Sequence, residues 1–453
     1  MKFLDQEYTR ASLKLALPVM LTQLGQVSVN LFDNMIVGQL LGGEALASVA
    51  LGNSVFFSAF VFAMGFSYAI PPLVSEAHSR NDHNRINSVF RHGFIVNISI
   101  GLLMMILILL GMPLLYHMNQ PAKIMPATIQ FLSVMALSMI PFMVFQTFRE
   151  VSEGLSFTMG VTKATIAANI VNIILNYVFI SGKMGFPAMG VRGSALATLI
   201  ARVFMVVFLY VILYRDERTS QYIKVFHLKI SGFSKKMFAN LLRLGLPTAL
   251  QLFFEVSAFA GAAFICGLVS SVDIAAHQIA LTLASFTFNL SVGFSVASTI
   301  MVGRKLGERD FMGLRAVGIN NLKIAFLFML LCGLAFIIGR NILPYFFVKD
   351  NDIQVVYIAA KLLIIASLFQ LSDGIQVTCL GCLRGFQDVK IPSIITFIAY
   401  WVITIPLGYF LCVVLKMGSV GMWMALGLGL TISALFLVVR FWKLSRRKIS
   451  VNL

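Results

Sequence analysis

Three carboxylates lie inside long apolar runs of this sequence, where an ionised group is unfavourable. Glu255 interrupts LQLFFEVSAFAGAAFICG (residues 250–267), Asp33 lies in FDNMIVGQL, and Asp373 lies in LFQLSDGIQVTCLGCLRGFQD. A charge near the centre of a bilayer costs at least about 2.5–3.5 kcal/mol, and such residues usually face a cavity or a partner on an ion pathway. We therefore interpret the three acids as candidates for binding a cation or a proton.

Asp373 has polar neighbours on its own helical face. Gln370 and Gln376 lie three residues to either side of it, so the three side chains form a polar stripe. The structural alternative is neutralisation by Lys361, which lies twelve residues earlier in the same run, at about 18 Å of helical rise. That separation favours a functional interpretation of Asp373, with Gln370 as an accessory residue.

Three amides share one face of another apolar run. In the segment NIVNIILNYVFI, the spacing i, i+3 and i+7 puts on one helical face Asn169, Asn172 and Asn176. Amides in membrane helices often only hold helices together. The next run contains GSALAT, in which Ser194 and Thr198 lie one turn apart among small residues that let two helices approach closely. Amide and hydroxyl oxygens beside the carboxylate of Asp33 would form a cation or proton site.

Motifs of enzymes and of metal centres are missing from the sequence. There is no Walker A sequence, no GxSxG and no HExxH, and the five cysteines and six histidines show no zinc-ligand spacing. We expect a protein that is not an enzyme, uses no cofactor, and holds no metal beyond a Na⁺ at the cation-binding residues. Without a visible ATP site, an ion gradient is the expected energy source.

Composition places these residues in a membrane protein. A soluble domain carries about 25% charged residues, whereas this chain carries 12% and is 59% hydrophobic. A transmembrane helix needs about 20 mostly apolar residues. Twelve such runs predict an all-α fold, at residues 11–40, 45–75, 90–116, 128–153, 163–181, 192–214, 240–268, 274–302, 317–347, 356–383, 391–415 and 419–441. Five prolines are expected to bend or break these helices: Pro18, Pro71, Pro141, Pro247 and Pro406.

The basic residues predict the orientation. Lys and Arg concentrate in alternate loops and in the C-terminal tail, whereas residues 41–44 and 269–273 contain none. By the positive-inside rule, both termini are cytoplasmic. The bases are scattered over short loops, so the net charge of +17 indicates contact with the lipid bilayer and gives no support to nucleic-acid binding.

The chain contains an internal repeat. LALPVMLTQLGQVS from Leu15 matches LGLPTALQLFFEVS from Leu244 at an offset of 229. At an offset of 228, MGFSYAIPPLVSEAHSRND (64–82) matches VGFSVASTIMVGRKLGERD (292–310), and Gly190 and Gly193 match Gly418 and Gly421. We predict two homologous six-helix lobes in a parallel repeat, an architecture known among transporters. The predicted domains are 1–214, a cytoplasmic linker 215–239, and 240–453.

The repeat shows which residue of the other lobe corresponds to each acid. Glu255 aligns with Gln26, and Asp33 aligns with Ala262, so each lobe keeps its acid at a different place. An acid needed only for folding the repeat would be expected in both lobes. This favours a functional Glu255 over a structural acid paired with a polar neighbour, such as Gln251 one turn earlier.

The residues resemble the multidrug and toxic compound extrusion (MATE) family, in particular its bacterial NorM-like branch. The resemblance rests on LALPVMLTQL, FDNMIVGQL, EGLSFT, NIVNIILNYVFISG, GVRGSALATLIAR, LGLPTALQLFFEVSAF, AAHQIA and CLRGFQD, in this order along the chain. It implies a V-shaped pair of six-helix lobes in the bacterial cytoplasmic (inner) membrane. It further implies export of organic cations and other amphipathic drugs by antiport with Na⁺ or H⁺, through alternating access. We expect a monomer, although the sequence does not determine the oligomeric state.

The resemblance also implies roles for residues. Glu255 and Asp373 would be the cation-binding carboxylates of the second lobe, and the first lobe's site would comprise Asp33, Asn172, Asn176 and Thr198. The branch usually has a tyrosine one turn before the second-lobe aspartate, where this chain has Phe369. The alternative function is a lipid-linked oligosaccharide or lipid flippase of the same superfamily, which would favour a cavity rich in Arg and Lys. The sequence leaves the choice between Na⁺ and H⁺ open.

Overall fold

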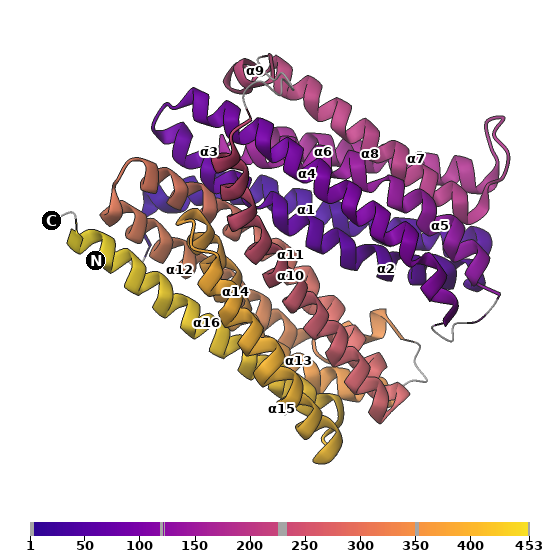
Figure 1. The fold of residues 1–453 in the computed structure, drawn as a ribbon. Coiled ribbons are helices and arrows are strands. Elements are labelled where there is room, and N and C mark those ends of the chain that lie inside the picture. The colour runs from indigo at the N-terminus through magenta and orange to yellow at the C-terminus, as the bar shows by residue number, and fades with distance from the viewer. Residues whose placement is uncertain (1–3, 118–120, 122, 225–232, 349–352, 452–453) are drawn as a thin grey trace. The chain divides into compact units, whose positions relative to one another are not determined.

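The structure is a computed structural model that describes residues 4–117, 121, 123–224, 233–348 and 353–451. All regular elements in these ranges are helices (Figure 1). The first half of the chain contains α1 (Gln6–Leu41), α2 (Gly43–Ser67), α3 (Ile70–Ser79), α4 (His83–Gly111), α5 (Met125–Leu137), α6 (Met139–Gly154), α7 (Thr158–Ser181), α8 (Gly190–Arg215) and α9 (Glu217–Lys224). The second half contains α10 (Lys235–Val269), α11 (Ser271–Gly307), α12 (Phe311–Gly339), α13 (Ile353–Gly385), α14 (Lys390–Phe397), α15 (Ile405–Tyr409) and α16 (Gly418–Val451).

The prediction of twelve membrane-spanning runs is confirmed for the described residues, where twelve helical spans are long and apolar enough to cross a bilayer. Several helices extend past the apolar run. The span predicted from residue 90 begins at His83, because Asp82 caps α4 by accepting a hydrogen bond from the Arg85 backbone N–H over 2.9 Å. Asp310, its counterpart at an offset of 228, caps α12 in the same way.

Prolines interrupt some spans and not others. The span Gly43–Ser79 breaks into α2 and α3 just before Pro71, and the span Met125–Gly154 breaks at Ser138, three residues before Pro141. Pro406 lies in the first turn of α15, between the π-helical segments Ile398–Thr404 and Phe410–Val414. Proline lacks the N–H that a helix needs and crowds the carbonyl four residues earlier. Two further prolines are accommodated inside continuous helices: Pro18 in α1 and Pro247 in α10.

The chain divides into two compact units. Unit 1 comprises Met1–Met20 and Leu250–Leu453, and unit 2 comprises Leu21–Ala249. These limits divide α1 and α10, so that the first part of each helix belongs to the opposite unit from its remainder. The predicted domains 1–214 and 240–453 stay a prediction, and part of the predicted linker, residues 225–232, lies outside the described residues.

A glycine at the same position of each repeat makes a close helix–helix contact within its own unit. In unit 2, a Cβ atom on Gly65 of α2 would lie 2.3 Å from the Cα atom of Ala249 in α10. In unit 1, a Cβ atom on Gly293 of α11 would lie 2.8 Å from the backbone oxygen of Ala16 in α1. Because Gly65 and Gly293 are related by the offset of 228, these contacts support the internal repeat.

Candidate functional site

The carboxylate of Glu255 lies in a buried hydrogen-bond network of unit 1. Tyr400, in the π-helical segment Ile398–Thr404, donates to Oε1 of Glu255 over 3.3 Å. Gln376 of α13 donates from Nε2 to the same oxygen over 3.2 Å and to the Tyr400 hydroxyl over 2.8 Å. The exposed fractions are 7% for Glu255 and 0% for both partners, so three elements hold this carboxylate away from bulk water.

Asp373 lies on α13, one turn before Gln376, and is 3% exposed. It makes no hydrogen bond or ion pair with any described residue, although the negative charges of Asp373 and Glu255 act on each other. Two neighbouring buried carboxylates are unfavourable when both are ionised, unless a cation or a proton is bound. The pair therefore has the chemistry of a monovalent cation or proton site.

Neither of the accessory glutamines of unit 1, Gln370 and Gln251, bonds to Glu255 or Asp373. Gln370 is fully buried and donates to the Thr287 hydroxyl over 2.6 Å. Gln251, which is 2% exposed, forms no side-chain hydrogen bond with a described residue. The polar neighbours that pair with Glu255 are therefore Tyr400 and Gln376, and not Gln251.

Phe369 lies in the apolar core of unit 1. Its ring centroid is 5.6 Å from that of Trp423 and 6.2 Å from that of Phe259. The hydroxyl that the resemblance leads one to expect on α13 is therefore absent. A hydroxyl nevertheless reaches Glu255, from Tyr400 on another element.

The candidate residues of unit 2 form one hydrogen-bonded chain. Asn176 of α7 donates from Nδ2 to Oδ1 of Asp33 in α1 over 2.6 Å and to Oδ1 of Asn172 over 3.2 Å. Asn172 donates to the Thr198 hydroxyl of α8 over 3.3 Å, and Thr198 donates to the backbone oxygen of Ser194 over 3.2 Å. The structure therefore brings together Asp33, Asn172, Asn176 and Thr198, with Ser194 contributing its backbone oxygen, whereas Asn169 makes no side-chain hydrogen bond with a described residue.

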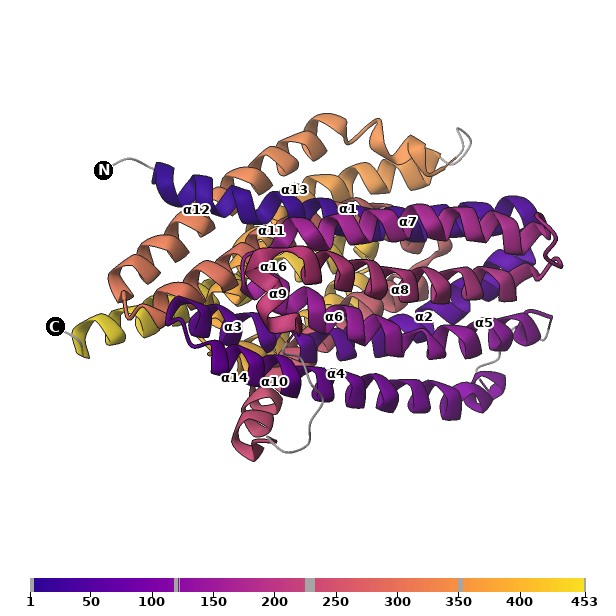
Figure 2. The same cartoon turned by 90° about the horizontal axis from the view of Figure 1, so that it is seen from above.

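Small residues allow this chain to close. Helices α7 and α8 run side by side (Figures 1 and 2), and a Cβ atom on Gly193 would lie 2.8 Å from the backbone oxygen of Phe179. Asn176 is fully buried, and no described residue donates a hydrogen bond to its Oδ1. An unsatisfied buried acceptor beside the carboxylate of Asp33 gives this cluster oxygen atoms that can receive a cation or a proton.

Two residues that act on these carboxylates were not among the predicted site residues: Tyr400, which bonds to Glu255, and Arg202, whose charge acts on Asp33. Tyr400 lies in an uninterrupted apolar run, so no local signal distinguishes it. Arg202 of α8 lies four residues after Thr198 and eight after Ser194, a spacing that places the three on one helical face. That spacing is a signal by which sequence reasoning could have found Arg202.

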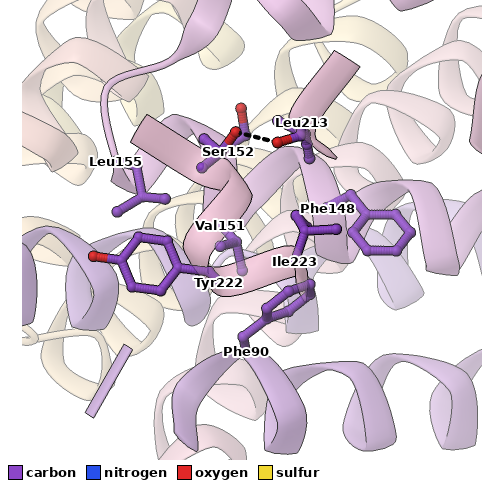
Figure 3. Close-up of a pocket in the computed structure, with 9 residues that line it drawn as sticks. Phe90, Phe148, Val151, Ser152, Leu155, Leu213, Tyr222 and Ile223 are labelled. Carbon is purple, nitrogen blue, oxygen red and sulfur yellow. Dashed lines mark hydrogen bonds between the residues drawn. The ribbon is translucent and has the colours of Figure 1, made fainter. Parts of the chain in front are cut away.

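A small pocket lies elsewhere in unit 2, where α9 packs. Figure 3 shows residues that line it, among them Tyr222 and Ile223 of α9 and the rings of Phe90 and Phe148. The Thr219 hydroxyl donates to the backbone oxygen of Leu213 over 2.6 Å. Burial raises the pKa of Tyr222. None of the residues predicted to bind a cation lines this pocket, which we interpret as the docking site of α9.

Comparison with known proteins identifies the family. The sequence model of the MatE family matches residues 18–178 and 247–410. The chain belongs to the MatE family.

Relatives with curated names cover nearly the whole chain. A probable multidrug resistance protein NorM from Agrobacterium fabrum is 32% identical over 97% of this chain and 94% of its own length. The multidrug resistance protein MdtK from Yersinia enterocolitica is 32% identical over 95% of this chain and 94% of its own length. The resemblance to the NorM-like branch is thereby confirmed.

Solved structures confirm the fold. An outward-facing multidrug resistance MATE family transporter of the MOP superfamily has a TM-score of 0.89 at 20% identity, covering 97% of this chain and 96% of that one. A MOP superfamily transporter from Pyrococcus furiosus, for which a reversed polarity of the binding pocket is described, has a TM-score of 0.88 at 19% identity, with the same coverage. The chain therefore has the fold of these solved transporters.

Proposed function

We propose that this MatE family protein is a multidrug efflux antiporter, which exports organic cations and other amphipathic drugs in exchange for Na⁺ or H⁺. The observation that carries the proposal is the pair Glu255 and Asp373, two interacting buried carboxylates of which Asp373 has no hydrogen bond or ion pair among the described residues. The full-length relatives named as multidrug resistance proteins support the substrate class. The transport cycle needs no enzymatic step and no cofactor other than the coupling ion.

A coupling ion would act on the carboxylate pair directly. A proton would neutralise one carboxylate and relieve the repulsion between them. A sodium ion would exchange its hydration water for oxygen ligands, which Glu255, Asp373 and the Tyr400 hydroxyl can supply. Alternating access then requires that the ion and the drug favour different states of the transporter.

The flippase alternative needs a different charge pattern. A pocket that takes a pyrophosphate or another anionic lipid headgroup is expected to present arginine and lysine. In unit 1, the described residues place no basic side chain in direct contact with either Glu255 or Asp373. The negative character of this cluster favours a cationic substrate over an anionic one.

Efflux from proteoliposomes tests the proposal. Purified full-length protein is reconstituted with ethidium inside, and efflux is driven by an imposed Na⁺ gradient at equal pH, or by a pH gradient without Na⁺. We expect at least one gradient to accelerate efflux and to identify the coupling ion. No acceleration by either gradient would overturn the proposal.

Two variants connect the activity to the site. Glu255→Gln and Asp373→Asn each keep the shape of the side chain and remove its charge. Each is expected to lower gradient-driven efflux about tenfold or more, the range typical of coupling between two ligands. Glu308→Gln is the matched control, because Glu308 pairs with Lys305 and is 43% exposed. An equal loss in all three variants would argue against a coupling role for the buried pair.

Location and assembly belong to the same proposal. We expect a monomer in the bacterial cytoplasmic membrane, with both termini in the cytoplasm. A C-terminal green fluorescent protein should fluoresce, and a C-terminal alkaline phosphatase should be inactive, because each reporter works on one side of the membrane only. The opposite pattern would contradict the orientation, and light scattering of the detergent-solubilised protein would reveal a dimer.

A further inference from the structure

Arg202 is a basic residue far from both ends of its transmembrane helix. It lies twelve residues after Gly190, the first residue of α8, at about 18 Å of helical rise. Arginine keeps its charge even in apolar surroundings. Such a residue is costly in a membrane and is expected to have a partner.

The guanidinium group is held by residues from two other spans. Its central carbon lies 4.9 Å from the ring centroid of Phe56, 5.8 Å from that of Phe60 and 5.2 Å from that of Phe142. Nη1 donates to the Ser138 hydroxyl over 2.6 Å, at the break between α5 and α6. Cation–π contacts and a hydrogen bond thus fix the position of the charge without neutralising it.

The acid that acts on Arg202 is Asp33. The charges of the two residues influence each other, yet the described side chains form no ion pair or hydrogen bond with one another. Oδ1 of Asp33 is instead occupied by Asn176, over 2.6 Å. Arg202 therefore compensates Asp33 from a distance and leaves the carboxylate accessible to another ligand.

Unit 1 has a different balance of charge. At the offset of 228, Arg202 corresponds to Leu430, which is fully buried. The basic residue that acts on Glu255 is Arg384, which donates to the Ser295 hydroxyl over 2.9 Å. In unit 1 the arginine acts on Glu255 and no basic residue acts on Asp373 among the described residues, whereas in unit 2 the one carboxylate, Asp33, has one arginine.

The remaining buried acids near the end of α6 do not alter this comparison. Glu153 forms an ion pair with Arg149, from Oε1 to Nε over 2.7 Å. Arg149 also interacts electrostatically with Glu150. This cluster has its own basic residue and is not connected by hydrogen bonds to Asp33 among the described residues.

We propose that Arg202 is a resident counter-cation of Asp33, which balances the unit 2 cluster without a bound ion, so that Glu255 and Asp373 carry the exchanged cation. The inference rests on the antiport proposed above. Asp33 then remains available to the drug cation. The carboxylate attracts the drug cation, which competes with Arg202 for the negative charge. Arg202 acts through Asp33 and is a positioning residue.

A double-mutant cycle in the reconstituted full-length protein tests this inference. Asp33→Asn is compared in the wild type and in the Arg202→Met background, because methionine fits the space among the phenylalanine rings and carries no charge. In the wild type, Asp33→Asn leaves the arginine uncompensated and is expected to lower gradient-driven ethidium efflux about tenfold or more. In the Arg202→Met background, the same change is expected to cost less than about threefold, since charges that interact give non-additive effects.

Ser138→Ala is the structural control. It removes the hydrogen bond to Arg202 and keeps the charge, so efflux should change less than about twofold if the charge is what matters. Size-exclusion chromatography and thermal unfolding show whether each variant folds. If Arg202→Met does not fold, Arg202→Gln takes its place, because glutamine keeps a donor for Ser138.

Several results would overturn the inference. One is an equal loss from Asp33→Asn in both backgrounds, and another is a loss from Ser138→Ala as large as that from Arg202→Met. Failure of both neutral variants to fold would make Arg202 a structural residue and would also overturn it. Failure of the antiport proposal is distinguishable, because wild-type protein would then show no gradient-driven efflux.

Discussion

The hydroxyl of Tyr400 donates a hydrogen bond to Oε1 of Glu255 over 3.3 Å, although 145 positions separate the two residues in the sequence. The bond connects α10 to a π-helical segment of the eleventh span. Segments of π-helix are frequent at functional sites. Here the segment contains the one hydroxyl that reaches the carboxylate among the described residues, and Gln376 bonds to both groups.

Removal of this hydroxyl should weaken ion binding. Tyr400→Phe keeps the ring and deletes one donor to Glu255, and we expect the ion concentration for half-maximal efflux to rise about three- to tenfold, the equivalent of one net hydrogen bond. The measurement is ethidium efflux from proteoliposomes as a function of the coupling ion identified above. Tyr409→Phe is the matched control, since Tyr409 is 47% exposed, and an equal effect in both variants would exclude a specific role for Tyr400.

Asn176 and Asn169 should differ sharply when each is replaced by alanine. Asn176 donates to the carboxylate of Asp33, whereas Asn169 makes no side-chain hydrogen bond with a described residue. A hydrogen bond to a charged group contributes about 1.5–3 kcal/mol, so Asn176→Ala should lower efflux about tenfold and Asn169→Ala less than about twofold. Similar losses, measured at the same reconstitution density, would show that the two amides serve only to hold helices together.

The fold was predictable because its signals are local. Apolar runs long enough to cross a bilayer predict the spans, but not the polar first turns of α4 and α12, which begin after the caps Asp82 and Asp310 and before the predicted residues 90 and 317. The carboxylates Glu255 and Asp33 were found for the related reason that a charge stands out in an apolar run. Among the residues near Asp33, Asn172 and Asn176 share one face of α7, and Thr198 shares one face of α8 with Ser194. The sequence displays both spacings directly.

The partners of the unit 1 carboxylates were not predictable. Tyr400 is one aromatic residue among many in an apolar run, and its contact with Glu255 depends on tertiary packing and on the widened turn of a π-helix. Phe369 is a second example. The sequence shows that the tyrosine hydroxyl expected at position 369 of α13 is missing, but it cannot show that Tyr400 of another element brings a hydroxyl to Glu255.

The buried ion pair of Arg149 and Glu153 should be important for stability. The two side chains are 2% and 1% exposed, and their atoms Nε and Oε1 lie 2.7 Å apart. Removal of one partner of a buried pair costs about 3–5 kcal/mol, so Glu153→Ala should markedly lower the thermal unfolding temperature in detergent. The exposed pair of Lys305 and Glu308 is the control, because such pairs contribute about 0–1 kcal/mol. Equal shifts for Glu153→Ala and Glu308→Ala would contradict the importance of burial.

The close contact at Gly65 gives a final test of the packing in unit 2. A Cβ atom there would lie 2.3 Å from the Cα atom and 2.8 Å from the backbone nitrogen of Ala249, and these backbone atoms cannot move aside at low cost. Gly65→Ala is therefore expected to destabilise the protein by about 1–3 kcal/mol, as overpacking does.

Gly427→Ala is the matched control in α16, where a Cβ atom would meet nothing within 4 Å. There alanine should be neutral or stabilising by about 0.4–1 kcal/mol, because it restricts the unfolded chain. The measurement is thermal unfolding of both variants in the same detergent. A Gly65→Ala protein as stable as the Gly427→Ala protein would show that α2 and the first part of α10 do not pack this closely.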